Sequence, residues 1–208
     1  MLPGPVEIIQ CPYCDQKFKK STMMSGNTMG AKFWTDGKRE APMLPESISV
    51  SFCKECSSYF WVDDAEVVDE AKPDSNKYSD LDYLKNLTLE QYIDALQKIE
   101  IRSDQDEFYL LRQIWWEYND YYREDKDAEI PRDIKKVIPD ILDKLLNNLN
   151  EENDEHLLIK GELLRELGQF KTAEKTLNKI SNPEYREVKQ FIMKLAKNEN
   201  SELKELEM

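Results

Sequence analysis

Hydrophobic and polar residues follow two different periods along this chain, and the change falls after residue 62. Before it, apolar residues come in short runs rich in β-branched and aromatic side chains, such as "VEII" at 6–9 and Val50 with Phe52. Such runs favour extended strands. From Thr88 onward, apolar residues recur every three or four positions, the spacing of one helix face. The pattern predicts an α+β protein, with a small β-rich N-terminal domain followed by an all-α domain of helical hairpins.

The helical part carries recognisable start signals. Thr88 and Gln91 form a capping box that opens a helix over 89–99, and Ser103 is placed to cap a longer helix over 104–124. Pro131 suits the first turn of a third helix over 131–149. Pro139 lies inside that helix, where a proline is expected to kink or break it.

A glycine spacing marks the region 154–186. In "DEHLLIKGELLRELGQFKTAEKTLNKI", Gly161 is followed seven residues later by Gly168 and then by small and apolar residues at Phe170, Ala173, Leu177 and Ile180. This segment resembles a tetratricopeptide repeat, although Lys160 and an early Pro183 depart from the pattern. The resemblance implies two antiparallel helices crossing closely at Gly161 and Ala173, with the earlier helices as degenerate repeats. A generic helical bundle is the alternative.

Four cysteines form two C-x-x-C pairs in the β-rich part. "CPYCDQKF" and "CKECSSYF" share the pattern C-x-x-C-x-x-x-F, with the cysteines at Cys11, Cys14, Cys53 and Cys56. A glutaredoxin-like site would need a helix starting at the first cysteine, and the residues after Cys14 lack helical periodicity. Two such turns facing each other would instead offer four thiolates to one metal ion.

The paired cysteines resemble the zinc-ribbon and rubredoxin-like class. The resemblance implies one structural Zn²⁺ per chain, with Phe18 and Phe60 packed beneath the turns. Iron in the same ligands and a redox or disulfide role remain alternatives. The class often has glycine after the second cysteine of each turn, where φ is positive, and here Asp15 and Ser57 stand there. The whole chain resembles small bacterial proteins that join a four-cysteine module to tetratricopeptide-like helices.

Composition changes abruptly after Trp61, which predicts domains at 1–62 and 88–208 joined by a connecting segment at 63–87. The 38 residues between Cys14 and Cys53 are a long insert, and Asp36-Gly37 within it predicts a β-hairpin beside the cysteine turns.

Charge separates the two parts further. The chain carries a net charge of −13, but residues 1–62 carry +1. Acidic helices repel a phosphate backbone, so nucleic acid is an unlikely partner. If nucleic acid bound, its contacts would come from the basic residues Lys17, Lys19, Lys20, Lys32, Lys38 and Arg39.

The start of the chain lacks a secretory-signal pattern, and no apolar run is long enough to cross a membrane, so we expect a cytoplasmic, reducing setting.

No catalytic motif emerges, and we predict that the protein is not an enzyme. His156, the sole histidine, lies among acidic residues and is expected to pack or face solvent. The sequence thus favours a zinc-stabilised helical-repeat scaffold or adaptor that binds another, unidentified protein, through exposed members of Glu155, Leu158, Glu162 and Arg165. The alternatives are a nucleic-acid-associated zinc ribbon and, third, a thiol oxidoreductase. The sequence names neither the partner nor the oligomeric state.

Overall fold

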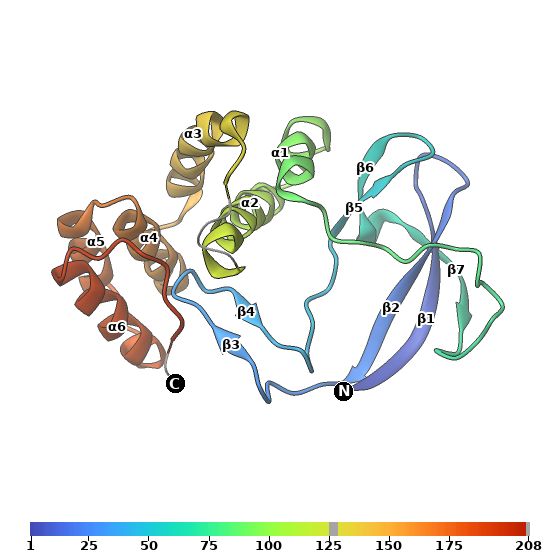
Figure 1. The fold of residues 1–208 in the computed structure, drawn as a ribbon, viewed down its shortest axis with the longest axis horizontal. Helices are drawn as coiled ribbons and strands as arrows, with labels where there is room; N and C mark the ends of the chain where they lie inside the picture. Colours follow the sequence, from blue (N-terminus) through green and yellow to red (C-terminus); the bar gives the residue numbers. More distant parts are fainter. Residues whose placement is uncertain (125–128, 207–208) are drawn as a thin grey trace. The chain divides into compact units, whose positions relative to one another are not determined.

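The computed structural model describes residues 1–124 and 129–206. The chain divides into two compact units (Figure 1). Unit 1 contains residues 1–31 and 40–100, and unit 2 contains residues 32–39 together with the chain from 101 onward. Within the described residues, seven strands precede six α-helices, so the predicted α+β class is confirmed.

Unit 1 is built on two antiparallel sheets. Strand β1 (Leu2–Gln10) lies between β2 (Lys17–Ser25) and β7 (Glu66–Ala71) in a three-stranded sheet. Strands β5 (Val50–Cys53) and β6 (Ser58–Trp61) form a separate hairpin, followed by the short 3₁₀ helix η1 (Val62–Asp64). Ile8 and Ile9 of β1 are both buried, and because neighbouring side chains of a strand point to opposite faces, this central strand is covered on both faces.

Helix α1 (Leu89–Lys98) completes unit 1. The predicted capping box is confirmed, because Thr88 and Gln91 exchange side-chain-to-backbone hydrogen bonds at its start. Tyr92 and Ala95 are buried on its inner face. The Tyr59 hydroxyl donates to Asp94 at 2.9 Å, and Trp61 Nε1 donates to the Glu100 carbonyl at 2.9 Å. These bonds join strand β6 to α1.

Unit 2 contains five α-helices. They are α2 (Asp104–Glu124), α3 (Arg132–Asn148), α4 (Asp154–Glu166), α5 (Phe170–Asn178) and α6 (Arg186–Lys197), with the 3₁₀ helix η2 (Pro183–Tyr185) before α6. Ser103 accepts a hydrogen bond from the Asp106 amide at the start of α2, which confirms the predicted cap. Helix α3 continues through Pro139, so the predicted break does not occur.

Helices α4 and α5 form a closely packed hairpin. A Cβ atom at Gly161 would lie 2.4 Å from Leu177 Cδ2, so only glycine permits this approach of the two helices. Ala173 on α5 is fully buried, as expected for a small residue at a close crossing. Gly168 has φ +72° between the helices, a left-handed conformation that glycine adopts freely. The close crossing and the turn predicted at these three residues are confirmed.

A hairpin from the long insert belongs to unit 2. Strands β3 (Lys32–Phe33) and β4 (Arg39–Glu40) flank a turn at Asp36 and Gly37, where Gly37 has φ +80°. The last described residues add to its edge: the Thr35 amide donates to the Lys204 carbonyl at 2.9 Å, and the Leu206 amide to the Phe33 carbonyl at 2.7 Å. The predicted turn is confirmed.

The observed division differs from the predicted domain boundaries in three places. The hairpin of residues 32–39 lies in the helical unit instead of beside the cysteine turns. Residues 63–87, expected to be a connection, include strand β7, whose backbone pairs with β1. Helix α1 belongs to unit 1, because Tyr59 and Trp61 bind it through long-range hydrogen bonds that a local reading of composition does not detect.

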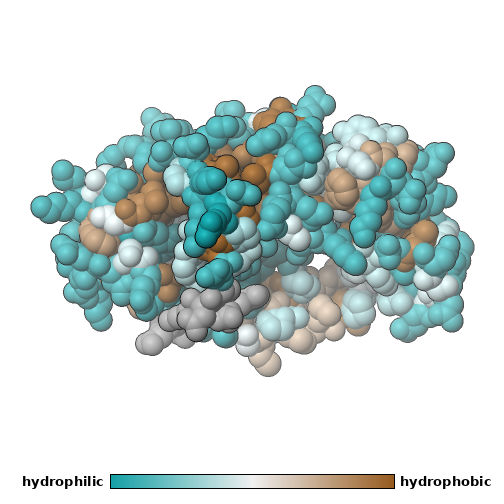
Figure 2. Space-filling model, turned by 45° about the horizontal axis from the view of Figure 1, so that its top comes forward, coloured by the Kyte–Doolittle hydropathy of each residue, from teal (hydrophilic) through white to brown (hydrophobic). Residues whose placement is uncertain are grey.

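Charged and apolar side chains are interspersed on the surface. The face in Figure 2 is mostly hydrophilic, with apolar residues scattered between charged ones. Among the described residues, no helix combines the length and the apolar character that crossing a membrane requires.

Candidate metal centre

Both C-x-x-C pairs lie at the tips of antiparallel hairpins. Cys11 and Cys14 occupy the turn between β1 and β2, where the Cys11 amide donates to the Gln16 carbonyl at 2.9 Å. Cys53 ends β5 and Cys56 lies in the turn that leads into β6. Each hairpin therefore fixes the spacing of one thiol pair through its backbone pairing.

The two tips bring all four thiols together. The Sγ atoms of Cys11 and Cys56 are 3.8 Å apart, those of Cys14 and Cys53 are 3.6 Å apart, and all four lie within 4.8 Å of one another. A tetrahedron with metal–sulfur bonds of about 2.3 Å has edges of about 3.8 Å. A disulfide would require sulfurs about 2.05 Å apart. The thiols are therefore unbonded and spaced as a four-sulfur metal site requires.

A small apolar core lies beneath the thiols. The rings of Phe18 and Phe60 are 6.0 Å apart between centroids, which confirms the predicted pairing of the two phenylalanines. Ile9, Val62 and Leu84 complete this core together with the buried thiols of Cys11 and Cys53. Cys14 and Cys56 are half-buried. The core thus packs residues of both hairpins against the buried thiols.

The residue after the second cysteine differs between the two turns. Ser57 has φ +54°, the left-handed conformation in which the class usually has glycine, while Asp15 is not among the residues with positive φ. One turn therefore has the left-handed conformation and the other does not. Ser57 adopts this conformation without being glycine, and Asp15 does not need it, so the four thiols come together without either glycine.

Burial and mutual contact shift the acidity of the thiols in different directions. Burial raises the pKa of Cys11 to about 12 and also raises the pKa of Cys53. At Cys56 burial acts in the same direction, but hydrogen bonds from Ser58 and the other three thiols outweigh it and lower the pKa to about 7. A buried cluster of thiols thus accommodates one negative charge easily and further charges only beside a cation.

The donor set itself fits a soft or borderline metal ion. Four thiolates in tetrahedral spacing suit Zn²⁺ or iron, whereas Mg²⁺ and Ca²⁺ prefer oxygen ligands. With four protein ligands, the coordination sphere of a tetrahedral ion is complete. The arrangement can therefore hold a metal ion and cross-link two hairpins.

The four residues predicted to contribute to a partner surface are not all accessible. Glu155 is exposed and Leu158 is half-buried. Glu162 and Arg165 are fully buried and form an ion pair with each other, with Arg165 Nη2 2.6 Å from Glu162 Oε1. Arg165 Nη1 also donates to the Asn200 carbonyl. Neither side chain is therefore among the exposed members of the predicted surface.

Three of the six cations predicted for a nucleic-acid surface are already paired with carboxylates. Lys20 contacts Glu7 at 2.9 Å, Lys32 lies 3.8 Å from Glu205, and Lys38 contacts Asp120. The Lys19 ammonium lies over the ring of Tyr83, 4.4 Å from its centroid. Four of the six cations therefore have a partner within their own unit.

His156 has a packing role, one of the two predicted for it. Its ring stacks on Phe108 with centroids 4.9 Å apart, and Nδ1 accepts a hydrogen bond from the Asn150 amide at 2.9 Å.

A buried polar network in unit 2 was missed by sequence reasoning. Asp36 of the hairpin accepts from Arg123 at 2.7 Å and from Asn119 at 2.9 Å, and its carbonyl accepts from Trp116 Nε1 at 3.0 Å. Trp115 donates to Glu166 at 2.7 Å. Because Asp36 and Arg123 lie 87 residues apart, no spacing in the sequence indicates their pairing.

Comparisons of the chain with protein-family models, with curated proteins and with solved structures found no match.

Proposed function

We propose that this protein is a zinc-stabilised scaffold or adaptor that binds another protein. In this proposal one Zn²⁺ is held by Cys11, Cys14, Cys53 and Cys56, and the helices of unit 2 provide the binding surface. We further propose that α4 and α5 form one tetratricopeptide-like repeat with α6 as its cap. The observation that carries the proposal is the closed four-thiol cluster between two hairpins.

Closure of the cluster supports a structural role for the metal. Four thiolates leave a tetrahedral zinc without a position for substrate, so its contribution is to folding. A small unit with two minor sheets and a few core residues gains much from such a cross-link. The Cys11–Cys14 turn leads into strand β2 and not into a helix, so this pair lacks the helix N-terminus that lowers the pKa of a glutaredoxin-like nucleophile.

Metal analysis of the purified protein tests the zinc proposal. We expect one zinc per chain, and protection of all four thiols from a thiol reagent until a chelator is added. Iron at the same stoichiometry would support the four-cysteine site but show that its metal is iron and not zinc. Absence of metal with four freely reacting thiols under native conditions would refute the proposal.

Cross-linking in cells tests the adaptor role. We expect a protein partner cross-linked to unit 2, resistant to nuclease, and retained when salt is moderate. Binding to a mixed-sequence oligonucleotide with a steep salt dependence would favour the nucleic-acid alternative instead, since each phosphate contact adds to the salt slope.

A further inference from the structure

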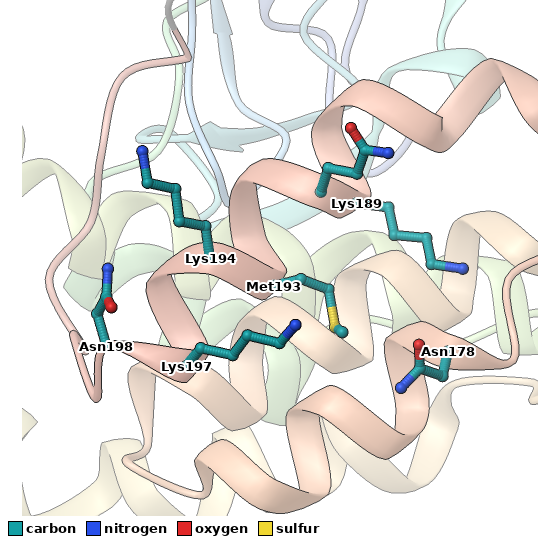
Figure 3. Close-up of a pocket in the computed structure, with 7 residues that line it drawn as sticks. Asn178, Lys189, Met193, Lys194, Lys197 and Asn198 are labelled. Carbon is teal, nitrogen blue, oxygen red and sulfur yellow. The ribbon is translucent and has the colours of Figure 1, made fainter.

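A groove between α5 and α6 stands out from the acidic surface of the chain. It has a volume of about 430 Å³ and is lined by Asn178 of α5, by Asn198 beyond α6, and by residues of α6: Lys189, Gln190, Met193, Lys194 and Lys197. In Figure 3 the side chains of Met193 and Lys197 point toward Asn178. The lining of the groove therefore includes one thioether and three lysines, and no carboxylate among the described residues.

The charge around the groove is opposite to that of the rest of the protein. Residues 170–197 contain seven Lys or Arg and three Asp or Glu, a net charge of +4. The whole chain carries −13, so all other residues together carry −17. Such a local reversal attracts anionic groups to one place and repels them elsewhere.

Two of the three lysines that line the groove are available to a ligand. Lys194 and Lys197 are exposed, and neither forms an ion pair with a carboxylate among the described residues. Lys189 is half-buried and donates to the Ile180 carbonyl at 2.9 Å, which fixes its position. The aliphatic stems of lysines and the flexible side chain of Met193 adapt to apolar groups of varied shape.

We propose that this groove binds an acidic polypeptide segment of a partner protein. The proposal rests on the adaptor function and specifies the chemistry of the partner. Carboxylates of the segment contact the lysines, and an apolar side chain between them contacts Met193. Lys189 and Lys197 are eight residues apart on α6, which is about 12 Å along the helix axis. An extended chain covers this length in about four residues. The segment therefore carries acidic residues about four positions apart.

Two labelled peptides test the proposal with the full, metal-loaded chain. One is a ten-residue peptide with glutamates four positions apart and a leucine between them, and the other has glutamine in place of each glutamate. We expect only the glutamate peptide to raise fluorescence anisotropy. Its affinity should fall when salt is raised from 50 to 300 mM, because exposed charges are screened over shorter distances.

Two double variants separate the groove from general attraction. Lys194→Gln with Lys197→Gln should weaken binding about twofold to thirtyfold, as expected for the loss of two exposed ion pairs. Lys171→Gln with Lys175→Gln removes the same charge from exposed positions of α5 that do not line the groove, and should change affinity less than twofold. Circular dichroism confirms that both variants remain helical.

Three results with the purified chain would overturn the proposal. They are absence of peptide binding, equal weakening in the two double variants, and a self-associating chain whose dimer is lost in the Lys194→Gln, Lys197→Gln variant, since a second copy would then occupy the groove. A fourth comes from the cross-linking in cells. A partner protein that cross-links elsewhere on unit 2 would overturn this inference but leave the adaptor function standing.

Discussion

Ser57 holds a backbone conformation that side chains rarely adopt. A residue other than glycine with φ near +54° is less stable there by about 1–2 kcal/mol, because Cβ crowds the following carbonyl. Ser57 keeps this conformation because it lies in the turn that the pairing of β5 with β6 closes. The second cysteine turn therefore contains local strain that the first does not.

Replacing this residue with glycine should stabilise unit 1. Ser57→Gly removes the strain but increases the freedom of the unfolded chain by about 0.4–1 kcal/mol, so we expect a net gain of up to about 1 kcal/mol. The temperature at which zinc passes to a chromophoric chelator measures the effect. Asp15→Gly is the matched control: it relieves no strain, adds unfolded-state freedom and removes the hydrogen bond that Asp15 accepts from Gln10 Nε2, so it should lower that temperature. Equal behaviour of the two variants would contradict the assignment of strain.

Glu166 is a second residue in an unfavourable environment, because its surroundings disfavour the charged carboxylate. Burial raises its pKa well above the ordinary value, and the carboxylates of Glu162 and Asp36 raise it further. Because folding raises the pKa of this carboxyl group, the folded state binds more protons than the unfolded state at pH values between the two pKas. Its contribution to stability is therefore largest below about pH 4.5 and declines as the pH rises toward the folded pKa.

The glutamine variant tests this linkage. Glu166→Gln removes the need for a proton, so we expect the melting temperature of unit 2 to exceed that of the parent at pH 8, with the difference shrinking toward pH 5. Helical ellipticity during heating measures it. Glu155→Gln, an exposed change on the same helix, should show no such trend. A pH-independent difference for Glu166→Gln would mean that lost hydrogen bonds, and not the proton, determine its effect.

Among the elements, the hairpin of α4 and α5 depends on one contact. Leu177 is fully buried and occupies the space that a Cβ at Gly161 would need, with Leu177 Cγ only 2.5 Å from that position. Because the core around Leu177 is filled, its side chain has little room to move aside.

A double-mutant cycle tests this close packing. Gly161→Ala should destabilise unit 2 by about 1–3 kcal/mol through overpacking, and Leu177→Ala by about 2–5 kcal/mol through a cavity. Together they should cost clearly less than the sum, because the added methyl group fills part of the space that Leu177 leaves. Urea unfolding followed by ellipticity measures all three variants. Additive losses would show that Gly161 and Leu177 do not compete for the same space.

Elements governed by neighbours in sequence were predictable. The capping box at Thr88, the turn at Gly37 and the glycine between α4 and α5 each follow from local chemistry, and the four thiols converged because matching hairpin turns carry them. Elements governed by distant partners were not. Strand β7 forms because β1 offers it a free edge, and the hairpin at 32–39 lies in unit 2 because Arg123 pairs with Asp36.

The accessible groove of unit 2 was missed for a different reason. The local excess of lysine in residues 170–197 is visible in the sequence, but charge was compared only between residues 1–62 and the whole chain. Conversely, Glu162 and Arg165 have the i, i+3 spacing of a helix ion pair, and only the structure shows that both side chains are fully buried.

At the scale of the whole molecule, the two units are expected to respond differently to loss of one thiolate. Cys53→Ser should abolish zinc binding, and unit 1 should lose its protection because its small core no longer has a cross-link. Unit 2 has its own core and buried ion pairs and should remain folded.

Hydrogen exchange resolves this prediction along the chain. In Cys53→Ser we expect fast exchange in residues 1–31 and 40–100, with slow exchange retained in residues 32–39 and in the helices after residue 101. Chelator treatment of the parent protein is the control and should give the same map. Fast exchange throughout residues 1–100 would show that the hairpin depends on the metal and not on unit 2.

The pairing of Thr35 with Lys204 also has a consequence for synthesis of the chain. The 169 positions that separate them in sequence take about 8 to 34 s to translate at 5–20 residues per second. Residue 56 is added to the chain much earlier, so all four cysteines have been synthesised while most of unit 2 is still unmade. Residues 32–39 lie in the loop between Cys14 and Cys53, and Asp36 has no Arg123 to pair with until α2 has been made. A ribosome that stalls between these points presents Asp36 without its partner, and the nascent chain is most exposed to aggregation and proteolysis during that interval.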